Sequence, residues 1–351
     1  DFYRLTGDKK LLEPVLIAWD DIVKKRLYIT GSTSSFEHFQ DDGLLPASNK
    51  DNIGEGCVTT TWIQFNKALL DITGEMKYAA QIEKAVYNHL LAAENPQTGC
   101  VSYYTSLMDA KPYNCGITCC TSSVPRGIAF IPSFGFGMYR NDPLLLNYEA
   151  AHYGTIVDNY NNPVEMILKV TGDFPSAGNP LVTVVLAHPA TFTLRLRVPE
   201  WCTGYTATIQ GKVYKGTPGQ LVAISRKWNN GDKIQVRFDM PLQQIPGGIS
   251  YPGLFAIQRG PQVLALDQSL NENTDMKIDS QSGPLTLVPS GEFNPVFKFP
   301  GNWIGKQSYS FAILKSRAGA KPAAIKLVPF ADAGQSGSPL KVWLPFQLKS
   351  K

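Results

Sequence analysis

Apolar residues recur at intervals of three and four along the first third of the chain, which is the spacing of amphipathic helices. This pattern predicts one helix over residues 9–29, a second over 57–72 and a third over 76–93. We expect a fourth over residues 122–134, with Pro125 in its first turn, where a proline is tolerated. The N-terminal part of the chain is therefore predicted to be helical.

A weak repeat links two of these helix junctions. Residues 5–10 (LTGDKK) resemble residues 72–77 (ITGEMK). In both, a glycine ends one helix and an acidic residue begins the next, as suits a helix N-terminus. Repeated helical hairpins are typical of an α/α toroid. A closed toroid of six hairpins needs more helices than this chain supplies, so we expect an upstream segment of the same protein to complete the barrel.

The pattern changes to alternation after about residue 138. The segments 164–170 (VEMILKV), 191–198 (TFTLRLRV) and 233–238 (KIQVRF) alternate or are rich in β-branched residues, and proline and glycine separate them. This predicts an antiparallel all-β region of one or two sandwiches. The expected fold is an α + β multidomain protein, with part of an (α/α)6 barrel over residues 1–137 and β-sandwich domains over 138–351.

Composition narrows the class of protein. The chain has 351 residues, of which 43% are hydrophobic and 18% charged, so it can bury a large core and is too long for one ordinary domain. Its net charge of +4 is small for this length, and no block of like charges is present. No apolar run approaches the ~18 residues of a membrane helix. We therefore expect neither nucleic acid nor a membrane as a partner.

Two adjacent cysteines are the strongest chemical signal. Cys119 and Cys120 stand side by side, and earlier in the chain Cys57 follows closely on Glu55 at the start of a predicted helix. A disulfide between neighbouring cysteines strains the peptide link, whereas a soft divalent metal accepts both sulfurs. Three thiolates and a carboxylate would form a closed, tetrahedral zinc shell. The alternative is a pair of buried free cysteines beside a surface glutamate, with no metal.

Other cysteines and histidines are expected to have plainer roles. Cys100 and Cys115 are predicted to be structural or free, although Cys115 could line the same loop as the cysteine pair and the clustering favours a site over a set of disulfides. Cys202 follows a tryptophan in the β region and is expected in its core. His38 and His89 are predicted to be loop and helix-surface residues rather than ligands.

A metal-bound thiolate is also a potential nucleophile, because the metal deprotonates the thiol at neutral pH. Attack on carbon would need a separate acid to protonate the leaving group. Glu37 is a candidate, in the loop 31–40 (GSTSSFEHFQ), and its neighbour Phe36 is expected to raise the pKa of its carboxyl group. The alternative is an exposed loop glutamate without a catalytic role.

Four stretches of the helical part stand in a specific order: GSTSSFEHF, GEGC, YNHLLAAENPQTGCVSYYTSL and CGITCCTSSVPRGIAFIP. Together with FTLRLRVPEWC and LFAIQRGPQVLALD in the β half, they resemble glycoside hydrolase family 127, the β-L-arabinofuranosidases. The resemblance covers roughly residues 28–267. It implies an (α/α)6 barrel followed by β-sandwich domains.

The resemblance also implies roles for individual residues. The E-x-C motif of the family binds zinc, and here it corresponds to Glu55 and Cys57. Both cysteines of its C-C motif bind zinc and the first is the nucleophile, which makes Cys119 the implied nucleophile and Cys120 a ligand only. Glu37 matches the acid/base.

Two further residues match substrate-binding positions. Tyr103, with Tyr104 as the alternative, matches a tyrosine that faces the sugar, and Arg126 matches the arginine after the cysteine pair. The sequence departs from the family at Ser123, where an asparagine is expected. Because both serine and asparagine can cap a helix, the fold need not change, whereas a role of that asparagine in the zinc site or in sugar binding would be affected.

The function implied is a retaining exo-glycosidase that uses Zn²⁺ and releases terminal L-arabinofuranose, or a similar pentose, from an oligo- or polysaccharide. Glu37 should then lie about 5 Å from Cys119, as in retaining pairs generally. One alternative is a non-catalytic carbohydrate-binding or scaffold relative with a structural zinc site. Another is a hydrolase of the same fold for a different sugar. We expect a periplasmic or secreted bacterial location rather than the cytoplasm.

Overall fold

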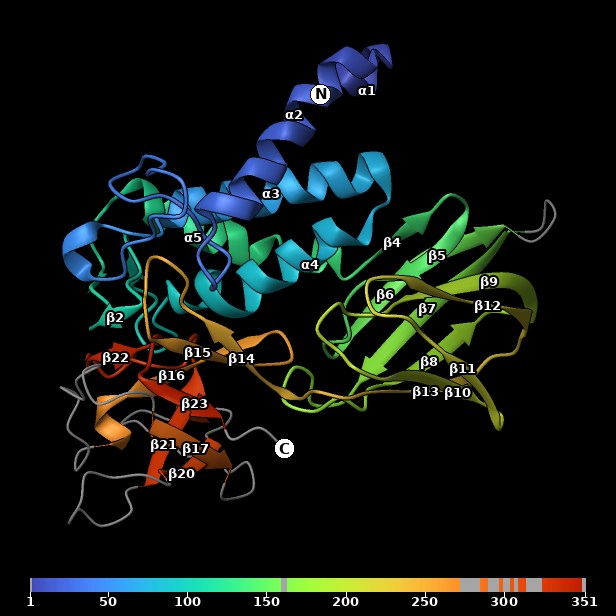
Figure 1. The fold of residues 1–351 in the computed structure, drawn as a ribbon. Coiled ribbons are helices and arrows are strands. Elements are labelled where there is room, and N and C mark those ends of the chain that lie inside the picture. The colour runs from blue at the N-terminus through green and yellow to red at the C-terminus, as the bar shows by residue number, and fades with distance from the viewer. Residues whose placement is uncertain are drawn as a thin grey trace.

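The computed structural model describes residues 2–158, 163–271, 285–289, 297–298, 304–305, 309–313 and 324–348. The helices gather in one part of the molecule, a β-sandwich lies beside them, and a further sheet lies below the helices (Figure 1). No helix in these ranges is long and apolar enough to cross a membrane.

The three N-terminal helices predicted from the apolar spacing are present, each within a few residues of the predicted bounds. The α-helices are α1 (Phe2–Thr6), α2 (Lys9–Asp21), α3 (Gly56–Thr73), α4 (Met76–Ala85) and α5 (Cys119–Ala129). Helices α2 and α4 continue as π-helical turns over Ile22–Arg26 and Val86–Leu90, and short 3₁₀ turns cover Asn49–Asp51 and Ile131–Phe134. One face of α3 and α4 packs into a shared core that contains Trp62, Ile63, Leu69 and Ile82.

The fourth helix begins earlier than predicted. Helix α5 starts at Cys119, not at residue 122, because a capping box precedes it. In this box the Thr118 hydroxyl accepts a hydrogen bond from the Thr121 amide, and the Thr121 hydroxyl accepts one from the Thr118 amide. Pro125 consequently lies in the interior of the helix, and its predicted place in the first turn was wrong. The adjacent cysteines therefore occupy the first turn of α5.

The repeated junctions have the same geometry. Gly7 and Gly74 both take left-handed φ values, +70° and +69°, directly after α1 and α3. In each case the preceding threonine, Thr6 or Thr73, donates a 2.8 Å hydrogen bond to the carbonyl oxygen four residues before it. The same hydroxyl accepts from the amide two residues later, at 3.2 and 3.1 Å. The sequence repeat thus corresponds to two helical hairpin junctions of one design.

Long strands begin soon after the last helical turn, and two sheets form the sandwich. Its strands are β4 (Phe136–Tyr139), β5 (Asp142–Leu145), β6 (Ala151–Asp158), β7 (Pro163–Thr171), β8 (Leu181–Leu186), β9 (Ala190–Arg197), β10 (Tyr205–Ile209), β11 (Lys212–Lys215), β12 (Leu221–Trp228) and β13 (Asp232–Phe238). One sheet has the order β11-β10-β13-β8-β7-β6 and the other β12-β9-β5-β4. Side chains alternate between buried and exposed along all of β7, so every second residue enters the core between the sheets. Cys202 lies in that core, as predicted.

A third sheet combines one strand of the helical part with strands from the C-terminal part of the chain. Its strands are β14 (Leu242–Pro246), β15 (Phe255–Arg259), β16 (Gln262–Asp267), β17 (Leu285–Pro289), β20 (Tyr309–Ile313), β21 (Ala324–Pro329), β22 (Leu340–Lys341) and β23 (Phe346–Leu348). Strand β2 (Met108–Asp109), from the helical part, pairs with β22. Two small pairs complete the described strands: β1 (Val101–Ser102) with β3 (Tyr113–Asn114), and β18 (Phe297–Lys298) with β19 (Ile304–Gly305).

The β region is not wholly antiparallel, which corrects the prediction. Strands β5 and β9 pair in parallel, and so do β17 and β23. Between β5 and β9 the chain passes through three strands of the opposite sheet before it returns, and such a crossover brings strands back in the same direction. The other pairings among the described strands are antiparallel.

A buried ion pair joins the helices to the sandwich. Glu83 of α4 accepts hydrogen bonds from Arg197 of β9 at 3.0 and 3.1 Å and from the indole N–H of Trp201 at 2.8 Å. The side chains of Arg197 and Glu83 are only 2% and 6% exposed. This contact fixes where α4, and the helices packed on it, sit relative to the sandwich.

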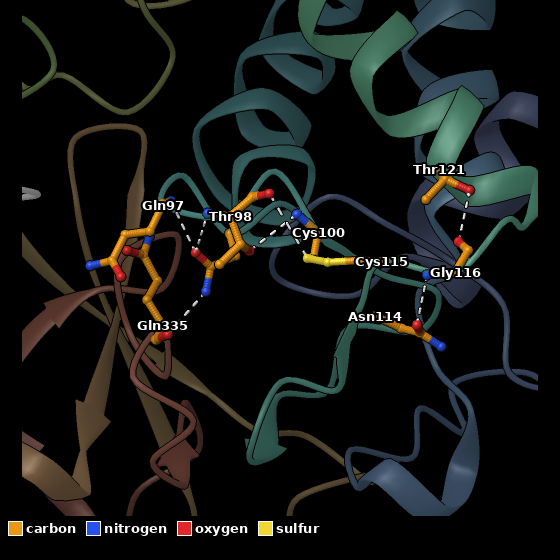
Figure 2. The surroundings of a disulfide bond; sticks show 9 residues. Gln97, Thr98, Cys100, Asn114, Cys115, Gly116, Thr121 and Gln335 are labelled. Atoms are coloured by element: carbon orange, nitrogen blue, oxygen red, sulfur yellow. Dashed lines mark hydrogen bonds between the residues drawn. A yellow bond between two sulfur atoms is a disulfide. The ribbon is translucent and has the colours of Figure 1, made fainter. Parts of the chain in front are cut away.

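Cys100 and Cys115 form a disulfide, with their Cα atoms 4.5 Å apart (Figure 2). Cys115 is therefore not a free thiol in the loop of Cys119, and the view that clustering favours a site over disulfides is wrong for these two residues. The bond closes the segment that carries β1 and β3, next to the turn formed by Gln97 and Thr98 (Figure 2).

Candidate functional site

Glu37 lies at the tip of a two-residue hairpin turn. Ser35 and His38 exchange two backbone hydrogen bonds of 3.0 and 3.1 Å, and the residues between them, Phe36 and Glu37, have φ values of +50° and +65°. Consecutive positive φ values are typical of type I′ turns, which favour asparagine and glycine. Phenylalanine and glutamate are strained in this conformation, as residues at functional sites often are. The turn leaves Glu37 exposed.

Two tyrosines hold the Glu37 carboxylate. The hydroxyl groups of Tyr103 and Tyr104 donate to Oε1 of Glu37 at 2.9 and 3.0 Å. These hydrogen bonds, that of Tyr103 first, lower the pKa of Glu37 below its ordinary value. The prediction that Phe36 raises this pKa is wrong, because Phe36 is 53% exposed and the two hydrogen bonds outweigh the small desolvation of the carboxylate.

The four predicted metal ligands come together in the structure. One carboxylate oxygen of Glu55 and the sulfurs of Cys57, Cys119 and Cys120 all lie within 4.8 Å of one another. Glu55 and Cys57 come from the N-terminus of α3, and the other two from the first turn of α5. Glu55 is 7% exposed, so the alternative that treated it as a surface residue does not hold.

Glycine between Glu55 and Cys57 allows the two helices to approach this closely. A Cβ atom at Gly56 would lie 2.6 Å from the side chain of Val124 and 3.3 Å from the sulfur of Cys120. The E-G-C triplet therefore brings both of its outer residues to the cysteine pair because its middle residue has no side chain.

The distances within the cluster fit a tetrahedral zinc ion. Sulfur atoms lie 3.6 Å apart for Cys57 and Cys120 and 3.9 Å apart for Cys119 and Cys120. The Glu55 oxygen lies 3.8 and 4.0 Å from the sulfurs of Cys119 and Cys120. A tetrahedron with Zn–S bonds of ~2.3 Å has edges of about 3.8 Å, so these donors could hold zinc with little movement.

Burial keeps two of the thiols protonated without a cation. It raises the pKa of Cys57 to about 11 and that of Cys120 further still. A divalent cation between the sulfurs would reverse this preference, because thiols that coordinate such a metal are deprotonated. The cluster thus has the donors of a metal site, and a bound cation would offset the desolvation of its thiolates.

Cys119 differs from its neighbour in accessibility. Cys119 is exposed, whereas Cys120 is fully buried. The sulfur of Cys119 lies 3.3 Å from the Tyr103 hydroxyl, which in turn lies 2.9 Å from Oε1 of Glu37. One hydroxyl oxygen therefore contacts both the sulfur and the carboxylate. Such a shared contact is compatible with the ~5 Å that separates the two carboxyl groups of retaining enzymes.

Ser123 contacts the cluster through Cys57, and Arg126 contacts Ser123. The Ser123 hydroxyl lies 3.2 Å from the sulfur of Cys57 and accepts a 3.2 Å hydrogen bond from the Arg126 guanidinium. Ser123 lies inside α5 and does not cap it, since Thr118 has that role. The departure from the expected asparagine therefore touches a candidate metal ligand. Arg126 itself is exposed.

His89 contributes to the site in a way that sequence reasoning missed. It is fully buried, not on the helix surface as predicted, because its helix packs under the loop before α3. Its Nε2 lies 3.0 Å from the carbonyl oxygen of Gly54 and its Nδ1 lies 2.8 Å from the Thr30 hydroxyl. The ring thus fixes the residue before Glu55. The available signal was a histidine next to Asn88 within a largely apolar stretch of the predicted helix.

Comparisons with known proteins identify relatives of both the helical part and the sandwich. Residues 1–133 match a family model described as β-L-arabinofuranosidase, GH127 catalytic domain, and residues 154–240 match the GH127 middle domain. The chain is 26% identical over 295 residues to a non-reducing end β-L-arabinofuranosidase of Bifidobacterium longum subsp. longum. That match covers 76% of this chain and 43% of the relative.

Solved structures give the same fold. One is Ara127N-Se, a GH127 β-L-arabinofuranosidase from Geobacillus stearothermophilus T6, with a TM-score of 0.80 and 21% identity over 99% of this chain and 58% of the other. Another is BT3674, a GH127 β-arabinofuranosidase, with a TM-score of 0.81 and 22% identity over 98% of this chain and 58% of the other. The chain spans less than two thirds of each relative.

The two family models match in succession, catalytic domain first, and together cover most of the helices and the sandwich. The chain therefore belongs to glycoside hydrolase family 127.

Proposed function

We propose that this protein is a retaining exo-glycosidase that releases terminal L-arabinofuranose, or a similar pentose, from an oligo- or polysaccharide. The observation that carries the proposal is the position of Cys119. Its sulfur is exposed at the edge of a largely buried donor set, and the Tyr103 hydroxyl contacts both this sulfur and the Glu37 carboxylate. A thiol with a structural role alone has no need of an accessible position opposite a carboxylate.

In the first step, the Cys119 thiolate attacks the anomeric carbon while Glu37 protonates the departing oxygen, which leaves the sugar bonded to sulfur. In the second step, Glu37 accepts a proton from water, the water oxygen bonds to the anomeric carbon, and the sulfur departs as thiolate. Bound zinc would supply the positive charge that keeps the cysteines as thiolates at neutral pH. Glu55, Cys57 and Cys120 would complete its shell.

The hydrogen bonds of Glu37 place a condition on the first step. Glu37 must carry a proton before it can act as an acid, yet two phenol hydroxyls stabilise its carboxylate in the absence of sugar. We infer that a sugar in the site displaces at least one of these hydroxyls and excludes water, which raises the pKa of the carboxyl group. Tyr103, Tyr104 and the exposed Arg126 are then free to bind sugar hydroxyls.

Completion of an (α/α)6 barrel by an upstream segment of the same protein belongs to this proposal. Three apolar side chains on α1 and α2 support it, because Phe2, Leu5 and Ile17 are 74%, 83% and 65% exposed.

A periplasmic or secreted bacterial location is also proposed. The disulfide between Cys100 and Cys115 supports it, since such bonds persist in oxidising compartments.

The proposal is tested with synthetic aryl α- and β-L-arabinofuranosides, a zinc assay and a chelator control. We expect hydrolysis of one anomer by the wild type, and a loss of roughly 10³-fold or more in Cys119→Ala, as for other catalytic nucleophiles. Cys202→Ala is the matched control, because that cysteine is buried in the sandwich. Bound zinc with no hydrolysis by the wild type would instead support a structural metal site. Hydrolysis of another sugar alone would change the substrate but not the mechanism.

A further inference from the structure

A cavity of about 260 Å³ lies away from the cysteine cluster, where the helices, the sandwich and the third sheet meet. Its walls come from the segment after α4, from α5, from loops of the sandwich and from β16 and the turn after β21. None of its lining residues belongs to the candidate zinc site or to the loop of Glu37. It is therefore a separate pocket, called the junction pocket below.

The charged side chains that line the junction pocket are all acidic. The carboxylates of Glu94, Glu149 and Asp332 line it, and among the described residues no lysine, arginine or histidine does. Glu149 accepts a 3.3 Å hydrogen bond from Tyr87, whereas the Glu94 carboxylate makes no hydrogen bond or ion pair within the described ranges. The pocket thus offers acceptors to whatever enters it.

Two buried glutamine side chains also line the junction pocket. Gln262 and Gln335 both line the pocket, and they are 6% and 8% exposed. The side-chain oxygen of each has no hydrogen-bond partner in the part of the chain that the structure describes. Buried acceptors are nearly always paired in folded proteins, because an unpaired one keeps its full cost of desolvation. Two such oxygens in one pocket indicate a ligand that donates hydrogen bonds.

The lining of the junction pocket does not form a typical metal site. Within the described residues, the Glu55 cluster is the only group of three or more acidic, cysteine or histidine side chains close enough to share an ion. A molecule with several hydrogen-bond donors would satisfy the Glu94 carboxylate together with the side-chain oxygens of Gln262 and Gln335. Apolar groups, among them three prolines, Leu91 and Ile128, form much of the remaining wall, and they suit contact with C–H groups.

We propose that the junction pocket binds a small polyhydroxylated molecule of monosaccharide size. Hydroxyl groups would donate to Glu94, Gln262 and Gln335, and the C–H face of the ring would lie on the apolar wall. Binding at the junction pocket does not depend on the proposed catalysis. That the ligand is a sugar and not another polyol rests on the proposed function. Because the pocket is shared by three parts of the fold, its ligand would stabilise their arrangement.

The test is calorimetric titration of the chain with L-arabinose, D-glucose, calcium and spermidine, together with hydrolysis assays. Gln335→Leu removes an acceptor and should weaken sugar binding about tenfold without changing hydrolysis. Glu94→Gln retains an acceptor oxygen and should change sugar affinity little. Glu165→Gln, on the exposed face of β7, is the control.

Three results would overturn the inference: no saturable heat with either sugar, unchanged sugar binding in Gln335→Leu, or binding of calcium or spermidine that Glu94→Gln abolishes. Circular dichroism of each variant verifies the fold. If Gln335→Leu does not fold, Glu94→Leu removes an acceptor at a side chain that is only partly buried, and it should weaken sugar binding in the same way. Sugar binding without hydrolysis would reject the proposed function alone. Hydrolysis without this second binding event would reject the junction pocket alone.

Discussion

Replacement of Glu83 by glutamine should destabilise the protein more than any conservative change on its surface. The carboxylate accepts three hydrogen bonds, two from Arg197 and one from Trp201, and the side chains of the ion pair are 2% and 6% exposed. Glutamine would place an N–H₂ group against a donor and leave the guanidinium charge buried without an anion. The guanidinium would keep the Leu146 carbonyl oxygen, at 3.4 Å.

The expected magnitude follows from that geometry. Removal of one member of a buried pair costs about 3–5 kcal/mol, whereas replacement of both by apolar residues is often neutral. Glu83→Gln should therefore lower the free energy of unfolding by about 4 kcal/mol, and Glu83→Leu combined with Arg197→Met should lower it by less. Asp20→Asn is the control, because Asp20 pairs with Lys24 on the surface and should matter little.

Urea unfolding followed by tryptophan fluorescence measures these differences, and Trp201 reports directly on the contact. Near-ultraviolet circular dichroism should show whether the indole loses its fixed surroundings. A loss below about 1 kcal/mol in Glu83→Gln, or a double variant less stable than the single one, would mean that the buried guanidinium does not depend on this carboxylate.

Three further predictions concern the loop, the cluster and the disulfide. Burial lowers the pKa of His89 to about 4, so as the pH falls the unfolded chain binds a proton at this residue before the folded protein does. The stability that depends on neutral His89 is therefore complete above pH ~6.5, and about 3 kcal/mol of it is lost as the pH falls toward 4. Unfolding of His89→Gln at several pH values should show a shallower acid dependence, and an identical slope would contradict this. Gly56→Ala should overlap with Val124, which would lower the free energy of unfolding by about 1–3 kcal/mol and lower the zinc content. Val124→Ala in the same chain should restore both. A normal zinc content in Gly56→Ala would contradict the close approach of the two helices. The disulfide joins cysteines that are 15 residues apart, so its reduction should lower the free energy of unfolding by about 3 kcal/mol, measured by thermal unfolding. The double variant Cys100→Ser/Cys115→Ser should be insensitive to reductant. An equally insensitive wild type would mean that the bond does not form.

The parts of the fold that local spacing determines were predictable from the sequence. Helix periods, the repeated Thr-Gly junctions and the E-x-C and C-C motifs are all local, and the structure brings Glu55 and the three cysteines together as expected. The start of α5 was predictable in principle, since Thr118 and Thr121 have the spacing of a capping box.

What could not be predicted depends on contacts between distant segments. The pKa of Glu37 is set by Tyr103 and Tyr104, which lie far along the chain, and not by its neighbour in sequence. The burial of His89 depends on a much earlier loop, through Gly54. The disulfide joins Cys100 to Cys115 across a small strand pair whose register no pattern of hydrophobic residues specifies.

The four donors of the cluster all belong to helix starts. Glu55 is the N-cap residue of α3 and Cys57 lies in its first turn, while Cys119 and Cys120 open α5. The N-terminus of a helix carries the positive end of its dipole and unpaired N–H groups. Three thiolates and a carboxylate carry four negative charges against the two positive charges of a zinc ion. Two converging helix dipoles would offset part of that excess, so with zinc bound the fold itself would act as a counter-ion for the thiolate-rich centre.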